Sequence, residues 1–295
     1  MILDTCRQAC SALATRRPSR RFGILVLVLV LSACTAAQTT RPGAIGLDRT
    51  QRFSTFLSEQ ELEQGAAQAY RQVLTKAQGE GNLNSDARMT QRVRAIADRL
   101  KPHVAVFRED ALNWNWEANV IESDQLNAWA MPGGKIAFYS GIIEQLQLTD
   151  AEIAAIMGHE IAHALREHSR ERASEQQISG LLLNGGVLLG SILTGTDLSG
   201  LGQGVQLGLQ VGISLPNSRL HETEADRVGI ELMARAGYDP RGAIRVWQKM
   251  AQKSGGKGGP QFMSTHPSPE SRIADLTDYA RRVMPLYQQA DKAPG

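Results

Sequence analysis

The sequence lacks two features that would each point to a large class of proteins, namely paired cysteines and a long apolar run. Its three cysteines are Cys6, Cys10 and Cys34, and the first two lie in a stretch that we expect to be removed on export. The remaining cysteine has no partner for an internal disulfide, which excludes a small disulfide-stabilised domain. The N-terminal apolar run from Phe22 to Leu31 has about ten residues, half of what a membrane-spanning helix needs.

A strong excess of one charge is also missing. The chain has 32 basic and 30 acidic side chains. Residues 1–33 contain five of the basic and one of the acidic side chains, so without them 27 basic and 29 acidic side chains remain, a sum of −2. The slight basicity of the whole chain therefore belongs to its N-terminus, and we expect no nucleic acid among its partners.

The N-terminus has the form of a bacterial export signal. Asp4 is its only acid, against five arginines before the apolar run: Arg7, Arg16, Arg17, Arg20 and Arg21. After the run, Leu31-Ser32-Ala33-Cys34 resembles a lipobox, in which the cysteine is lipidated and becomes the first mature residue. We predict a lipoprotein signal peptide over residues 1–33 and a lipid anchor on Cys34. Thr35, where an aspartate would favour the inner membrane, favours the periplasmic face of the outer membrane. Ser19-Arg20-Arg21-Phe22 partly matches a twin-arginine signal, so the export route stays open.

The most informative motif is His159-Glu160-Ile161-Ala162-His163, which has the HExxH pattern. Thr149 and Glu152 form a capping-box pair ahead of it, and the apolar spacing that follows predicts a buried helix. Two histidines at i and i+4 lie on one helical face and can bind one zinc ion, while the intervening Glu160 can activate water. A single HExxH also arises by chance, so the motif needs a third ligand.

Two places in the chain could supply that ligand. A third histidine at the spacing HExxHxxGxxH is absent, and His168 lies about 140° around the helix from His163, where we expect it to be solvated. A second predicted helix opens with Glu222, Glu224 and Asp226. Glu222 and Asp226 share a face, so one could bind zinc while the other orients a ligating histidine. We expect Glu224 to be solvated. An ordinary acidic helix N-terminus would give the same pattern.

Four motifs in order resemble the Ste24/HtpX/Oma-type zinc metallopeptidases, which are gluzincins. They are the HExxH helix, Ser218-Arg219-x-x-Glu222-x-x-Ala225-Asp226, the segment from Asn127 to Ile136, and the segment from Thr265 to Ile273. The resemblance covers about residues 56 to 285. It implies one zinc per chain held by His159, His163 and Glu222, with Asp226 orienting a ligand and Glu160 as the general base.

The resemblance also implies roles for two further elements. Asn127, Ala128, Trp129 and Ala130 would form an edge strand that binds an extended peptide, although the Pro132-Gly133-Gly134 turn alone predicts only a hairpin. His266 would lie near the metal, where it could stabilise the oxyanion or instead occupy the fourth zinc position and silence the enzyme.

The resemblance implies a zinc endopeptidase of the bacterial envelope. By analogy, its substrates would be misfolded or stalled periplasmic and outer-membrane proteins, and the outer-membrane assembly machinery would be a possible partner. The alternative is a non-catalytic lipoprotein that serves as a chaperone or adaptor in that assembly.

The predicted fold is α+β and mostly helical, with a small sheet and hairpin beside the HExxH helix. We assign residues 34–55 to a lipidated, polar tether and residues 56–290 to one peptidase domain. Helices are expected over 61–77, 87–100, 149–165, 218–236, around 243–250 and over 270–289, and a strand over 113–121. Residues 180–214 are rich in glycine and nearly uncharged, and we expect two closely packed helices there.

Overall fold

Local signals set the helix starts in the computed structural model, which describes residues 34–55, 57–176, 218–253, 262–263, 266 and 271–293. Helix α3 (Glu59–Gly79) begins with a capping box in which the Glu61 N–H donates to Ser58 Oγ over 3.2 Å. Helix α4 (Ala87–Leu100) begins at Asp86, whose carboxylate accepts from the Met89 N–H over 3.0 Å. Both helices match the predicted ranges to within two residues.

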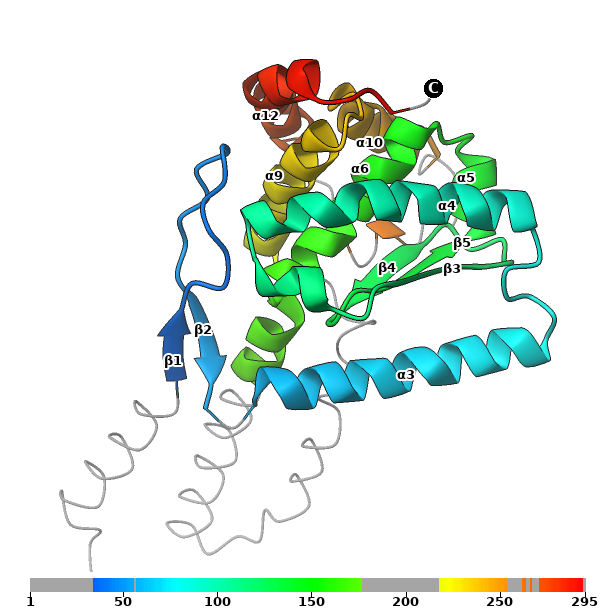
Figure 1. Cartoon of the computed structure of the whole chain (residues 1–295), viewed down its shortest axis with the longest axis horizontal. Coiled ribbons are helices and arrows are strands. Elements are labelled where there is room, and N and C mark those ends of the chain that lie inside the picture. The colour runs from blue at the N-terminus through cyan, green and yellow to red at the C-terminus, as the bar shows by residue number, and fades with distance from the viewer. Residues whose placement is uncertain are drawn as a thin grey trace, which may run out of the picture.

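A mixed three-stranded sheet lies between α4 and α3 (Figure 1). Strand β3 (Glu117–Ile121) pairs in parallel with β5 (Lys135–Tyr139), which pairs antiparallel with β4 (Ala128–Met131), giving the order β3-β5-β4. The turn between β4 and β5 places Gly133 and Gly134 at φ +77°, a conformation that favours glycine. The predicted hairpin is therefore present, with β4 at an edge of the sheet.

Helices cover both faces of this sheet (Figure 1). Helix α3 packs on one face, where the Tyr70 hydroxyl donates to the Ile136 carbonyl over 2.8 Å. Helices α4 and α6 (Asp150–Leu165) pack against the other face. The short helix α5 (Ser140–Gln145) follows β5, and two 3₁₀ helices, η1 (Lys101–Val106) and η2 (Asp110–Asn113), connect α4 to β3. The mostly helical α+β fold is confirmed.

In the described part of the chain, three further helices lie on the side of the molecule where α6 lies. They are α9 (Arg219–Arg235), α10 (Arg241–Lys253) and α12 (Ser271–Gln289), and α9 packs against both α6 and α12. Two glycines permit the close crossing of α6 and α9: a Cβ on Gly158 would lie 2.8 Å from the Gly229 carbonyl oxygen, and a Cβ on Gly229 would lie 2.7 Å from the His159 nitrogen. This crossing brings the HExxH helix against the acidic start of α9.

The N-terminal arm, residues 34–55, which we predicted to be a polar tether, forms regular structure and contacts the domain. Its strands β1 (Cys34–Ala37) and β2 (Gln51–Ser54) pair antiparallel, and the loop between them packs on the domain. Ile45 and Leu47 are buried in the main core, and the Ile45 N–H donates to the Glu231 carboxylate over 2.9 Å. Because the arm is mostly polar, its composition did not predict that these two residues would be buried.

Two other expectations need comment. The predicted strand over 113–121 begins only at Glu117, because residues 110–113 form η2 and the Trp116 indole N–H donates back to the Ala111 carbonyl over 2.8 Å. The two helices expected over 180–214 lie outside the described residues. Among the residues that are described, no helix is long and apolar enough to cross a membrane.

Candidate metal centre

Helix α6 presents the two histidines of the HExxH motif on one face. Thr149 and Glu152 form the predicted capping box at its start. His159 and His163 are both buried, and their Nε2 atoms lie 3.1 Å apart. The Nε2 atoms of the two rings therefore face the same point, as the i, i+4 spacing predicts.

Helix α9 brings two carboxylates to this point. Ser218 caps the helix by accepting from the His221 N–H over 3.1 Å. Glu222 places Oε2 at 3.4 Å from His159 Nε2 and Oε1 at 3.4 Å from His163 Nε2. Asp226, one turn later, places Oδ1 at 2.9 Å from His159 Nδ1. Of the two acids that spacing left open, Glu222 faces the space between the histidines and Asp226 lies behind His159.

His266 lies in the same cluster. Its Nδ1 is 3.0 Å from Glu222 Oε1 and 3.2 Å from His159 Nε2, and its Nε2 is 3.4 Å from Glu160 Oε1. The ring stacks on Phe262 with centroids 4.3 Å apart. The predicted proximity of this histidine to the HExxH motif is therefore present in the structure.

These donor atoms fit a tetrahedral cation. One ligand atom from each of His159, His163, Glu222 and His266 lies within 4.8 Å of all the others. Ligands about 2.0–2.1 Å from a tetrahedral zinc are about 3.3–3.4 Å from one another, and the closest donor contacts here are 3.0–3.4 Å. Imidazole nitrogens and one carboxylate are also ligands that zinc prefers.

Arg272 holds the two carboxylates of α9 in place, a role that spacing alone did not predict. Its guanidinium donates to Asp226 Oδ2 over 2.7 Å and to Glu222 Oε2 over 2.8 Å. The same group lies 3.8 Å from the centre of the Trp247 ring. Arg272 therefore fixes both acids, and it shares Asp226 Oδ1 and Glu222 Oε2 with His159.

Burial and the carboxylates set the protonation of the two α6 histidines. Burial disfavours the charged form of His159, but hydrogen bonds to Asp226 and Glu222 raise its pKa to about 9. At His163 burial dominates and holds the pKa well below its ordinary value. A histidine binds metal only through a neutral ring, so a cation bound here would displace a proton from His159.

Glu160 sits between the metal cluster and the edge strand. Its Oε2 accepts from the Ala130 N–H of β4 over 3.3 Å, and its Oε1 has no hydrogen-bond partner among the described residues. Burial raises the pKa of this carboxyl above its ordinary value. A buried carboxylate with one oxygen that accepts no hydrogen bond, beside a cation site, is suited to accept a proton.

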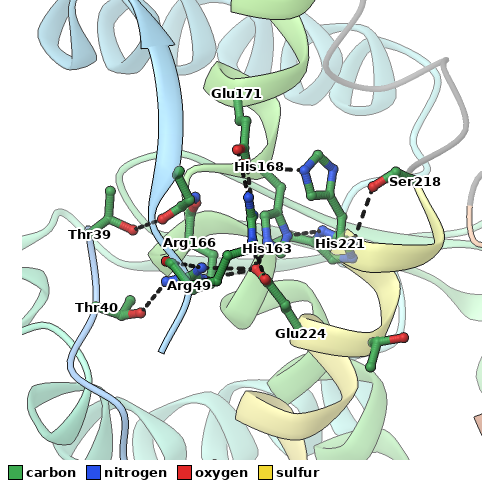
Figure 2. Close-up of polar contacts among 12 residues, drawn as sticks. Thr39, Thr40, Arg49, His163, Arg166, His168, Glu171, Ser218, His221 and Glu224 are labelled. Carbon is green, nitrogen blue, oxygen red and sulfur yellow. Dashed lines mark hydrogen bonds and ion pairs between the residues drawn. The ribbon is translucent and has the colours of Figure 1, made fainter. Parts of the chain in front are cut away.

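Two of our expectations about neighbouring residues are wrong. Helical spacing predicts a solvated His168, yet it is fully buried with Nδ1 at 2.9 Å from His163 Nδ1. Helix α6 ends at Leu165, and Glu167 adopts a φ of +49°, so the 140° rotation does not apply beyond it. Glu224, also expected in solvent, is 1% exposed and lies 3.1 Å from His168 Nε2 (Figure 2).

The sequence matches known proteins over most of the described domain. The model of peptidase family M48 matches residues 87–280. Mitochondrial metalloendopeptidase OMA1 of Saccharomyces cerevisiae is 32% identical over 183 residues, which is 60% of this chain and 50% of that protein. OMA1 of Schizosaccharomyces pombe is 32% identical over 228 residues, 77% of this chain and 63% of that protein.

A bacterial relative matches over a longer stretch. The beta-barrel assembly-enhancing protease of Escherichia coli (strain K12) is 27% identical over 247 residues, covering 82% of this chain and 48% of that protein. The chain thus spans about half the length of this relative and of OMA1 from Saccharomyces cerevisiae.

Proposed function

The chain belongs to peptidase family M48, a family of zinc-dependent metallopeptidases, and on that premise we propose that it is an endopeptidase of the bacterial cell envelope. Its substrates would be misfolded or stalled periplasmic and outer-membrane proteins. The observation that carries the endopeptidase function is the convergence of four buried metal-binding groups beside a glutamate that contacts an edge strand.

We assign the metal ligands to His159, His163 and Glu222, with one zinc per chain. Asp226 orients His159 by accepting from its Nδ1–H, which leaves Nε2 free to bind. Zinc, when bound, supplies Lewis acidity that polarises a carbonyl and makes water more acidic. Glu160 accepts the proton of the attacking water and donates it to the leaving amine.

The substrate would bind along the open edge of β4. In the antiparallel pair of β4 and β5, the Tyr139 N–H donates to the Asn127 carbonyl, so Asn127 and Trp129 direct their backbone groups toward β5. Ala128 and Ala130 then direct theirs toward the open edge. The Ala128 N–H already donates to Asn127 Oδ1 and the Ala130 N–H to Glu160 Oε2. We therefore propose that an extended peptide pairs with the carbonyls of these two alanines, while Asn127 and Trp129 support the strand.

His266 would act at the same place in one of two ways. Its Nδ1 lies among the donor atoms, where it could take the fourth position on zinc and keep water out. Its Nε2 lies near Glu160, so in a rotated position the ring could instead stabilise the oxyanion. The short contact with Glu222 favours the first role for the arrangement seen here.

The proposed cellular location is based on the sequence. The lipobox-like Leu31-Ser32-Ala33-Cys34 supports a lipid anchor on Cys34, and the name of the Escherichia coli relative supports a link to β-barrel assembly. The relatives named OMA1 are mitochondrial, so the family alone does not fix the compartment.

Zinc content of purified variants tests the ligand assignment. The full chain should contain about one zinc, and His163→Ala and Glu222→Ala should each lose it, because removal of one of three ligands leaves an incomplete site. Asp275→Ala, which removes an acid that pairs with Arg227 on the outer side of α9, is the matched control and should retain zinc. Stoichiometric zinc in Glu222→Ala would reject this carboxylate as a ligand.

A further inference from the structure

The two histidines of α6 have different partners at Nδ1. His159 faces the Asp226 carboxylate, whereas His163 Nδ1 lies 2.9 Å from the Nδ1 of another imidazole, that of His168. Two facing nitrogens at this distance share one hydrogen, carried by one of the two rings. His163 Nε2 points into the donor cluster and has a lone pair for a cation only when the hydrogen is on Nδ1. His163 is therefore the donor and His168 the acceptor.

The opposite edge of His168 completes the arrangement (Figure 2). A neutral ring that accepts at Nδ1 carries its hydrogen on Nε2, and this nitrogen lies 3.1 Å from Glu224 Oε2. The ring is fully buried, so water cannot replace either partner. His168 is thus fixed from both edges, and its orientation determines where His163 can point.

Two guanidinium groups hold Glu224 in position. Arg166, which is fully buried, donates to Glu224 Oε2 from Nε over 3.1 Å and from a terminal nitrogen over 3.0 Å. Arg49 of the N-terminal arm donates to both oxygens of Glu224 and to both oxygens of Glu171. Arg166 in turn donates to Thr40 Oγ1 over 2.8 Å. The arm is therefore bound directly to the carboxylate behind His168.

We propose that His168 and Glu224 are positioning residues for the metal site. The His163 Nδ1–H donates to His168, the His168 Nε2–H donates to Glu224, and Arg166 and Arg49 fix Glu224. This proposal rests on the zinc site of the proposed function. Of the three acids near the start of α9, Glu222 binds the metal, Asp226 orients His159, and Glu224 orients His163 through an intervening imidazole.

The same cluster does not suit a second cation. His168 and His221 stack with centroids 4.4 Å apart, and Glu171 and Glu224 lie close by, which are the residue types of a metal site. However, the Arg49 guanidinium already lies between the two carboxylates and neutralises them. A divalent cation there would have to displace a buried ion pair, so the positioning role fits the contacts better.

We call the hydrogen-bonded chain from His163 through His168 to Glu224 the relay. Zinc affinity, measured by competition with a chromophoric chelator, tests it. All variants are made in the full chain carrying Glu160→Gln, which prevents self-cleavage. We expect His168→Leu to weaken zinc binding by about 10–100-fold, as removal of an outer-shell partner of a ligating histidine does. His168→Gln should recover part of that loss, because its amide offers both an acceptor and a donor.

His221→Leu is the matched control. His221 is equally buried, stacks on His168 and pairs with Glu171, but it does not contact His163. Its loss should lower thermal stability while leaving zinc affinity unchanged. Equal zinc affinity in His168→Leu and the parent would overturn the relay, as would an equal loss in both leucine variants. A parent protein that binds no zinc would overturn the zinc site itself.

The tautomer of His168 gives a second test that needs no substitution. In zinc-loaded protein labelled with ¹⁵N-histidine, the relay predicts a neutral His168 with its hydrogen on Nε2 and a His163 with its hydrogen on Nδ1. A His168 ring with its hydrogen on Nδ1 would contradict the proposal even if the leucine variants failed to fold.

Discussion

A side chain at Gly158 should weaken the close crossing of α6 and α9. In Gly158→Ala the new Cβ would lie 2.8 Å from the Gly229 carbonyl oxygen, a contact so short that the two backbones must shift apart. Overpacking of this kind costs about 1–3 kcal/mol, and the better helix propensity of alanine returns about 1 kcal/mol. The net loss is about 0–2 kcal/mol.

Two measurements follow from that displacement. For a domain of this size each kcal/mol lowers the Tm by about 2–4 °C, so the Tm of Gly158→Ala should fall by up to about 8 °C. Gly158 precedes His159, and α9 carries Glu222, so the same displacement moves the metal-binding groups apart. Zinc affinity, measured by chelator competition, should therefore fall as well.

Gly79→Ala is the matched control. It lies at the end of α3, where a Cβ would meet nothing within 4 Å. This variant should be as stable as the wild type or slightly more stable, with unchanged zinc affinity. Equal Tm and equal zinc affinity in Gly158→Ala and Gly79→Ala would refute the claim that the close crossing of α6 and α9 positions the metal-binding residues.

Three further predictions concern other parts of the chain. His266→Ala should raise basal cleavage or self-cleavage if the histidine caps the metal, or lower turnover by about a hundredfold if it stabilises the oxyanion; unchanged kinetics would exclude both. Cys34→Ala should abolish labelling by a lipid precursor and move the protein to the soluble fraction, unless another segment provides the membrane affinity. Burial raises the pKa of Glu171, but its hydrogen bonds to Arg49 and His221 outweigh that effect and hold the pKa below its ordinary value. The stability from this group is present above about pH 4.3 and is lost as the pH falls below it, so Glu171→Gln should lose less Tm than wild type between pH 5 and pH 3.

Much of the fold follows from signals that are local in the sequence. Capping pairs at Ser58 and Thr149 mark the starts of α3 and α6, and 3.6-residue spacing defines α4. The HExxH spacing brings two imidazoles onto one face without further help. Where the structure agrees with prediction, the information lies within about one helical turn.

The errors concern one local turn and contacts between distant segments. The turn at Glu167 uses a positive φ in a residue that gives no glycine or proline signal, so helical geometry misplaced His168. Arg49 is 175 residues from Glu224, and no pattern in the polar N-terminal arm predicts that contact. Spacing alone left Glu222 and Asp226 as equal candidates, and only the crossing at Gly158 shows which one faces the histidines.

The central claim is that Glu160 acts as the proton acceptor beside a zinc held by His159, His163 and Glu222. The most direct measurement is the rate of casein cleavage by wild type and Glu160→Gln, each shown beforehand to contain one zinc per chain. The amide of glutamine cannot accept a proton from water, so the variant should be slower by about 10²–10⁴-fold. Equal rates for the two zinc-loaded proteins would contradict the mechanism.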